Sequence, residues 1–293
     1  MTVSRIDRST VRRLALLAPA AAVVGLLLGA PVALLLSYGF APGGSTQADF
    51  SDGATLENYA AVLGDSFYLN IILKTLWLSL VVTAASVVIG WMLAYFLWRT
   101  PVRFKALLTV AVVAPLLVSI PVRNYGWMVL LGDTGLVNIA LQKAALVERP
   151  LKLMFTDLAV VIGLTHVLMP FVVLSVMATL ERIPANLPEA ARSLGANRLA
   201  AVRLVVLPLS VPGIVAGATL VFCVAISSYV TPALMGPSGA KYAATLIYQQ
   251  FMSTFDWPRG AAIATILLVV TAMTVVLGLG VVGRRYRHLM QAH

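Results

Sequence analysis

Residues 184–208 read PANLPEAARSLGANRLAAVRLVVLP and separate two long apolar segments of the chain. Pro188 suits the first turn of a helix, and Glu189 complements the positive end of the helix dipole there. Gly195 then interrupts the helix, and a basic amphipathic segment follows over residues 198–206. We therefore expect two short helices joined by a glycine turn near a membrane surface. Such a pair has no core of its own and needs a partner to bury it.

The composition of the whole chain points to a membrane protein. Of its 293 residues, 60% are hydrophobic and 11% are charged, and the mean hydropathy is +0.94. Soluble domains have about 25% charged and 45–50% apolar residues, and the excess of apolar residues here cannot fit into one globular core. This excludes a soluble enzyme, a disordered chain and a secreted disulfide scaffold. The single cysteine, Cys223, lies in an apolar stretch and is interpreted as a packing residue.

Six stretches are apolar enough, and at about 20 residues long enough, to span a bilayer as helices. They are residues 14–38, 75–98, 106–131, 158–180, 209–234 and 260–283. The first follows Arg12 and Arg13 like a signal peptide, but its apolar run is longer than the roughly 7–15 residues of a signal-peptide core. We interpret it as a retained anchor. The predicted fold is therefore an all-α integral membrane protein with six spans.

The Lys and Arg residues are concentrated in every second connection between the predicted spans. One side of the membrane receives 14 of the 21 Lys and Arg residues with three acidic residues, and the other side receives seven with eight acidic residues. The positive-inside rule then places both termini and residues 184–208 in the cytoplasm. It places residues 40–66, 132–156 and 236–259 outside as loops, the second with a short interfacial helix near Leu136. The net charge of +10 is thus a topology signal, and nucleic-acid binding is not predicted.

The cytoplasmic segment resembles the EAA loop of ABC importer permeases. Its residues Glu189-Ala190-Ala191 are followed after three residues by Gly195, after nine more by Val205, and then by Leu207-Pro208. Only Val205 departs from the family pattern, which has isoleucine there. The position of the segment, between the fourth and fifth of six spans, is also that of the family.

Further motifs are similar to the spermidine/putrescine-type branch of these type I, binding-protein-dependent permeases. They are PVRNYGW at residues 121–127, the following Leu131-Gly132, and YVTPAL at residues 229–234. Related branches that carry iron, thiamine, phosphonates or opines share them. The resemblance defines a core permease domain at residues 67–283 with its coupling loop at 184–208. Residues 1–66 precede it as a cytoplasmic N-terminus, first helix and external loop, and residues 284–293 follow as a cytoplasmic tail.

The resemblance implies a division of labour in a bacterial inner membrane. The coupling residues Glu189, Ala190, Ala191, Gly195, Val205, Leu207 and Pro208 would dock on a dimer of ATP-binding subunits. The other implied partners are a second, non-identical permease subunit, an external solute-binding protein and membrane lipid. The sequence lacks a GxxxxGK[ST] phosphate-binding loop, so ATP and Mg²⁺ would be bound by the partner ATPase. No catalytic residue, metal ligand or cofactor is expected in this chain, and a polyamine or related organic amine is the first choice of solute.

Arg123 is the most conspicuous candidate pathway residue. A charged side chain at the centre of a spanning helix costs about 2.5–3.5 kcal/mol. One interpretation is a pathway residue paired with Asp133 or Asp157; the other is an interfacial arginine beside Tyr125 and Trp127, whose side chain reaches the headgroups. Two prolines in the same span, Pro115 and Pro121, predict an irregular helix.

The other candidate pathway residues are His166, Ser227, Ser228 and Tyr229, together with Tyr125. His166 fits an interhelical hydrogen bond or a solute contact, and the other histidines, His288 and His293, are too remote in sequence to complete a metal site. The hydroxyl groups at 227–229 fit either a solute pathway or helix packing. Gly213 and Gly217 predict a close approach of two helices.

Two other classes of protein remain as alternatives. An ion-coupled secondary transporter or channel would require intramembrane carboxylates and broken midplane helices in both halves, and it would leave the EAA loop unexplained. A membrane enzyme or scaffold would lack any nucleophile–base pair or metal motif. Within the spans only Asp157, at an edge, is acidic, and Arg123 would repel an amine. Both observations count against a polyamine solute.

Overall fold

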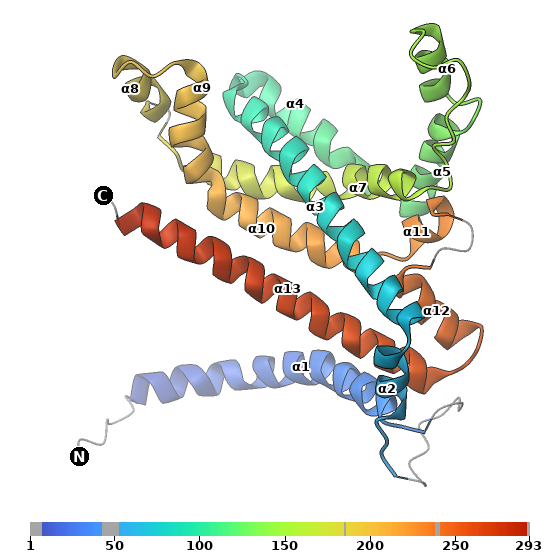
Figure 1. The fold of residues 1–293 in the computed structure, drawn as a ribbon. Helices are drawn as coiled ribbons and strands as arrows, with labels where there is room; N and C mark the ends of the chain where they lie inside the picture. The colour runs from blue at the N-terminus through green and yellow to red at the C-terminus, as the bar shows by residue number, and fades with distance from the viewer. Residues whose placement is uncertain (1–7, 43–52, 185, 238–240, 292–293) are drawn as a thin grey trace. The chain divides into compact units, whose positions relative to one another are not determined.

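The computed structural model describes residues 8–42, 53–184, 186–237 and 241–291. Within these residues every regular element is a helix (Figure 1). Five of the helices are long and apolar enough to cross a membrane, and a sixth span is counted if one sharply bent helix pair is taken together. The chain divides into two compact units, Met1–Ser66 with Ile247–Ile266, and Phe67–Leu246 with Leu267–His293.

The first unit contains α1 (Arg8–Gly39) and α2 (Glu57–Gly64). The predicted first span is helical throughout. The buried Asn58 on α2 donates a hydrogen bond from Nδ2 to the carbonyl oxygen of Ala41 at 2.8 Å, which fixes α2 to the end of α1. The prediction of a simple loop at residues 40–66 is therefore wrong for its second part. The predicted turn residues 43–52 lie outside the described residues.

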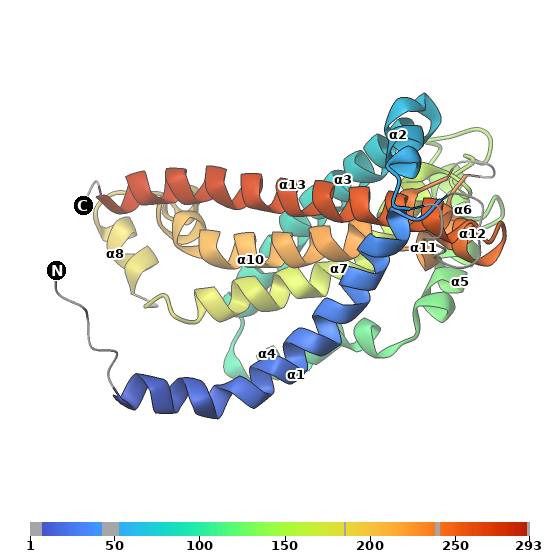
Figure 2. The ribbon, with the colours of Figure 1, turned by 90° about the horizontal axis from the view of Figure 1, so that it is seen from below.

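The core of the second unit is built around α7 (Asp157–Leu180). Helix α10 (Leu207–Ile226) lies alongside it (Figure 2). A Cβ atom at Gly217 would lie 2.9 Å from the Cα of Val172, so the close approach predicted for Gly213 and Gly217 is confirmed. Helix α3 (Ser66–Arg99) joins this pair, since Trp91 donates a hydrogen bond from Nε1 to Ser210 Oγ of α10 at 2.8 Å.

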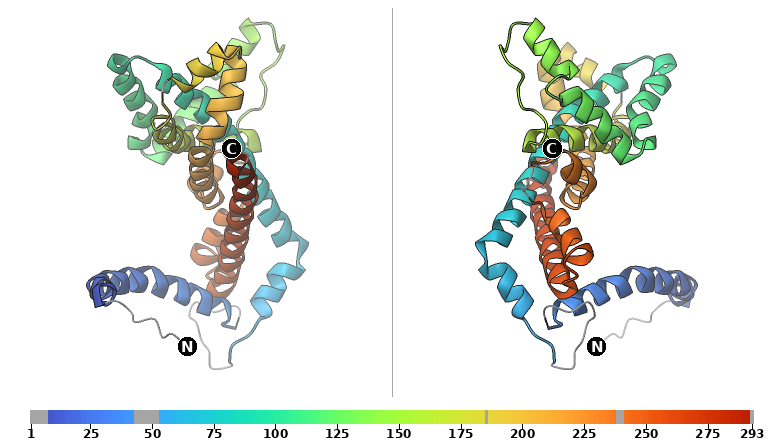
Figure 3. Two further views of the ribbon diagram at one scale, coloured as in Figure 1. Left: turned by 90° about the vertical axis from the view of Figure 1, so that its left-hand side faces the viewer. Right: turned by 90° about the vertical axis from the view of Figure 1, so that its right-hand side faces the viewer.

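The third predicted span is broken (Figures 2 and 3). It consists of α4 (Val102–Val113), the 3₁₀ turn η1 (Ala114–Leu117) and α5 (Ile120–Leu131), and the axis turns by 100° between η1 and α5. Pro115 lies in η1 and Pro121 lies in the first turn of α5, so both prolines stand where the helix cannot continue. The predicted irregularity is confirmed. The short helix expected near Leu136 is present as α6 (Leu136–Lys143).

The fifth span ends earlier than predicted. Helix α10 ends at Ile226, and a separate helix α11 (Val230–Met235) follows after a break at residues 227–229. Pro232 explains the break, because its ring excludes an α-helical carbonyl four residues earlier, at Ser228. After α11 come α12 (Ala243–Met252), in a stretch predicted as loop, and the last helix α13 (Trp257–Gln291).

Candidate functional site: the coupling loop and the α5–α7–α11 junction

The segment between α7 and α10 folds as the sequence predicts. Helix α8 (Leu187–Ser193) has Pro188 and Glu189 in its first turn, and α9 (Arg198–Ala201) follows the glycine. Gly195 has a φ of +93°, in the left-handed region, and nothing lies within 4 Å of the position of an added Cβ. Glycine is therefore favoured there by backbone conformation rather than by a close neighbour.

The coupling segment continues directly into α10. A π-helical turn, η2 (Val202–Val206), joins α9 to α10, and Ala201 and Val206 are buried. The coupling residue Val205 is half-buried in this turn, and Leu207 and Pro208 open α10. A displacement of α8 and α9 would therefore be passed to α10 without an intervening flexible loop.

The coupling segment exposes both leucine and arginine side chains. Leu194, Leu199 and Leu204 are 90%, 75% and 71% exposed, and Arg192, Arg198 and Arg203 are exposed beside them. Exposed apolar side chains that form a contiguous patch are typical of binding surfaces. Glu189 and Ala190 are also exposed, whereas Ala191 is half-buried.

An ion pair that the sequence analysis missed lies next to this segment. Lys105 Nζ on α4 lies 2.6 Å from Glu181 Oε1, directly after α7. The pair joins the broken span to the start of the coupling segment. Opposite charges at the same predicted membrane face were the only signal for it, and many residues share that signal.

Arg123 has a partner that neither interpretation foresaw. Its half-buried guanidinium donates a hydrogen bond from Nη1 to the carbonyl oxygen of Pro115 at 2.6 Å, across the break in the span. It forms no ion pair within the described part of the chain, and the pairing with Asp157 is wrong because that carboxylate contacts Lys74. The same carbonyl oxygen also accepts the backbone N–H of Val118 at 3.3 Å, so Arg123 adds a charged donor to an oxygen at the break.

Polar contacts join α5 to α7 and α11. Trp127 Nε1 donates to His166 Nδ1 at 3.2 Å, so the interhelical hydrogen bond expected of His166 is present. The buried Asn124 donates from Nδ2 to Thr231 Oγ1 at 3.1 Å, linking α5 to α11. Asn124 and Thr231 were not singled out from the sequence, although both lie within the quoted motifs.

The six candidate pathway residues lie on or next to the helices that meet at this junction. Arg123 and the exposed Tyr125 lie on α5, His166 lies on α7, and Ser227, Ser228 and Tyr229 form the break before α11. Helix α11 packs against both α5 and α7. The hydroxyl of Ser227 is exposed and donates to the carbonyl oxygen of Cys223 at 3.0 Å. The structure thus gathers residues from three separate stretches of sequence into one region.

Residues 86–287 match the family described as the inner membrane component of binding-protein-dependent transport systems. The chain belongs to this family. It is 34% identical over 219 residues to the spermidine/putrescine transport system permease protein PotB of Salmonella typhimurium strain SL1344, covering 75% of this chain and 76% of that protein. The identity to PotB of Escherichia coli K12 is also 34%, with 79% of that protein covered.

Solved structures show the same fold. A bacterial ABC transporter involved in the import of the acidic polysaccharide alginate has a chain that matches with a TM-score of 0.71 at 16% identity, covering 96% of this chain and 98% of that one. This binding-protein-dependent permease is therefore an all-α, multi-pass transport subunit of a bacterial inner membrane.

A second missed cluster lies at the start of α7 in this permease. Lys74, Asp157 and Tyr242 come from three stretches of sequence and meet through one carboxylate oxygen. Burial and the nearby Asp157 carboxylate raise the pKa of Tyr242, so its hydroxyl stays protonated and donates. Lys74 and Asp157 have opposite charges on the same predicted membrane face, but nothing in the sequence indicated Tyr242.

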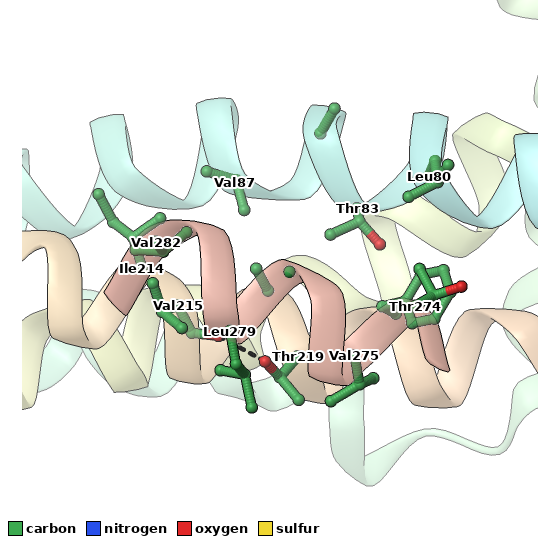
Figure 4. A pocket seen from close by; sticks show the side chains of 14 residues that line it. Leu80, Thr83, Val87, Ile214, Val215, Thr219, Thr274, Val275, Leu279 and Val282 are labelled. Atoms are coloured by element: carbon green, nitrogen blue, oxygen red, sulfur yellow. Dashed lines mark hydrogen bonds between the residues drawn. The ribbon is translucent and has the colours of Figure 1, made fainter. Parts of the chain in front are cut away.

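A large groove of the permease does not suit a polar solute (Figure 4). It has a volume of about 420 Å³ and lies between α3, α10 and α13. The hydroxyls of Thr83, Thr219 and Thr274 in its wall all donate to carbonyl oxygens of their own helices, at 2.7, 2.9 and 2.8 Å. The groove therefore presents an apolar wall, of the kind that contacts lipid or another helix.

Proposed function

We propose that this chain is one membrane-spanning subunit of an importer for spermidine, putrescine or a related organic amine, driven by ATP that a separate subunit hydrolyses. The observation that carries the proposal is the 34% identity over 219 residues to PotB proteins. At 219 residues, that stretch is far longer than any single motif.

The exposed coupling face supports docking of an ATPase. Leu194, Leu199 and Leu204 need a partner surface, and the adjacent arginines favour acidic or carbonyl groups on it. The direct continuation through η2 supports the transmission of ATPase closure to α10 and on to the break at residues 227–229. In this proposal the movement of α10 changes access to the junction with α5 and α7. ATP and Mg²⁺ belong to the ATPase.

A second permease subunit is supported by the exposed apolar helices. Only 6% of the residues in the most hydrophobic windows of α1 and of α13 are buried. Lipid covers some of this surface, and a non-identical permease subunit would cover the side that faces the solute pathway. The family description supports an external solute-binding protein as the source of the solute.

One observation favours a different solute for the same importer. A cationic amine is best held by carboxylates or aromatic faces. Among the described spanning residues the acidic side chain Asp157 is already paired, and the junction carries the guanidinium of Arg123. This charge balance favours an anionic or zwitterionic solute, such as a phosphonate or an opine, as the second candidate; iron and thiamine have no such support here.

The deciding experiment is uptake by intact cells of the source bacterium. Deletion of the gene for this chain should abolish uptake of radiolabelled spermidine or putrescine, and the gene on a plasmid should restore it. The affinity-tagged chain should co-purify with an ATPase and a second permease. Normal polyamine uptake in the deletion strain, together with lost uptake of a phosphonate or opine, would contradict the amine assignment and support the second candidate.

A further inference from the structure

The Lys74–Asp157–Tyr242 cluster ties together three distant segments at the end of α7 opposite the coupling loop. Asp157 Oδ1 accepts a hydrogen bond from the Tyr242 hydroxyl at 2.5 Å and lies 2.9 Å from Lys74 Nζ. The Lys74 ammonium also lies 5.1 Å from the centre of the Tyr242 ring, where a cation interacts favourably with the aromatic face. The Asp157 carboxylate therefore connects α7 to Lys74 on α3 and to Tyr242, the residue that precedes α12.

The Lys74 and Asp157 side chains are 33% and 52% exposed, and it is burial of the α12 side of the cluster that makes the arrangement hard to open. Tyr242 is 1% exposed, and the next residue, Ala243, is fully buried. The backbone nitrogen of Ala243 donates to the buried Thr75 Oγ1 on α3 at 2.9 Å. Separating these segments would leave a phenol hydroxyl and a backbone N–H without acceptors, and each such loss is unfavourable.

The cluster is connected to the α5–α7–α11 junction through the chain that follows α11. The beginning of α11 is held to α5 by the Asn124–Thr231 hydrogen bond, and its last residue, Met235, is fully buried. Tyr242 follows a few residues later in the chain. The stretch after the α10 break is thus fixed near both of its ends.

We propose that Asp157 is a positioning residue. With Lys74 and Tyr242 it forms a latch that stays closed throughout the transport cycle and keeps the residues of the α10–α11 break in register with α5 and α7. The proposal rests on the proposed solute pathway at that junction. It assigns no contact between Asp157 and solute.

The test uses the whole complex in lipid vesicles, with the ATPase activity stimulated by the binding protein as the readout. Asp157→Ala should lower the stimulated activity about tenfold, because the buried Tyr242 loses the carboxylate that accepts its hydrogen bond. Asp157→Asn should stay within about twofold of the wild type, since the amide oxygen still accepts that hydrogen bond. The recovered ATPase stoichiometry should be unchanged in both variants. Equal activity of the alanine variant and the wild type would overturn the proposal.

An engineered disulfide between α3 and α12 provides a second, sharper test. The 2.9 Å contact between Thr75 Oγ1 and Ala243 N brings the two Cα atoms within the limit of about 7 Å for a disulfide. The test variant combines Asp157→Ala with Thr75→Cys and Ala243→Cys in a chain whose native cysteine is removed by Cys223→Ala. Oxidation, which forms the disulfide, should restore the stimulated ATPase activity of this variant, and reduction should abolish it again. Failure of this rescue would overturn the proposal. So would loss of activity when the same disulfide forms beside the native Asp157, because the latch would then have to open.

The same vesicles separate this proposal from the proposed function. Stimulation is measured with the binding protein that co-purifies, whatever solute that protein carries, whereas accumulation of labelled spermidine requires spermidine to be the solute. Absent spermidine uptake with normal stimulation and normal disulfide rescue would refute the amine assignment and leave the latch standing.

Discussion

Arg123 shows how one side chain stabilises a break in a membrane span. Its Nη1 donates to Pro115 O at 2.6 Å, so a charged donor on α5 joins a carbonyl oxygen of η1 eight residues earlier in the chain. Two interpretations of this arginine followed from its neighbours in sequence, and neither included a backbone carbonyl. The bend of 100° that brings Arg123 and Pro115 together is not encoded in the spacing of hydrophobic residues.

Substitution of Arg123 should separate this structural contribution from contact with solute. Arg123→Met removes the donor and should lower the free energy of unfolding of the complex by about 1.5–3 kcal/mol, the range for hydrogen bonds to charged groups. Arg123→Lys keeps a cationic donor and should retain most of both stability and uptake. The measurements are thermal unfolding in detergent and uptake in vesicles. If both variants unfold like the wild type but fail to transport, Arg123 contacts the solute.

At the scale of elements, the predictable features were those that depend on local residues. The pattern of Pro188, Glu189 and Gly195 predicted α8, the turn and α9, and Gly213 and Gly217 predicted the contact between α7 and α10. The end of α10 at Ile226 was missed, because the apolar run continues to residue 234 and hides the effect of Pro232. Helices α2 and α12 were missed because both are short and lie in stretches rich in polar residues.

The turn between α8 and α9 gives a prediction at this scale. Gly195→Val should be strained by about 1–3 kcal/mol at a φ of +93°. The strain would move α8 relative to α9, so less ATPase should co-purify or its hydrolysis should no longer drive uptake. Gly195→Asn is the matched control, because asparagine tolerates the left-handed region better. Both variants should insert normally in the membrane. Equal ATPase recovery and uptake for valine, asparagine and wild type would contradict the role of the turn.

At the scale of the whole molecule, the distribution of charge predicts the orientation of the chain. The side with 14 basic residues also contains the coupling segment, as an ATPase partner requires. Reporter fusions after Lys105, at Gly195 and after His288 should report the cytoplasm, and fusions near Gly53, Leu146 and Ser238 should report the exterior. An external signal at Gly195 would overturn the orientation and the docking of a cytoplasmic ATPase together.

Binding of the ATPase to the exposed face of α8 and α9 is the contact proposed to drive this permease. Its most direct test is the amount of ATPase subunit recovered with the tagged complex after Leu194→Glu. Leu194 is 90% exposed in the coupling segment, and Leu146, 71% exposed between α6 and α7, provides the matched control Leu146→Glu. We predict that Leu194→Glu loses most of the ATPase while Leu146→Glu keeps it. Full ATPase recovery with Leu194→Glu, accompanied by normal stimulation by the binding protein, would contradict the claim.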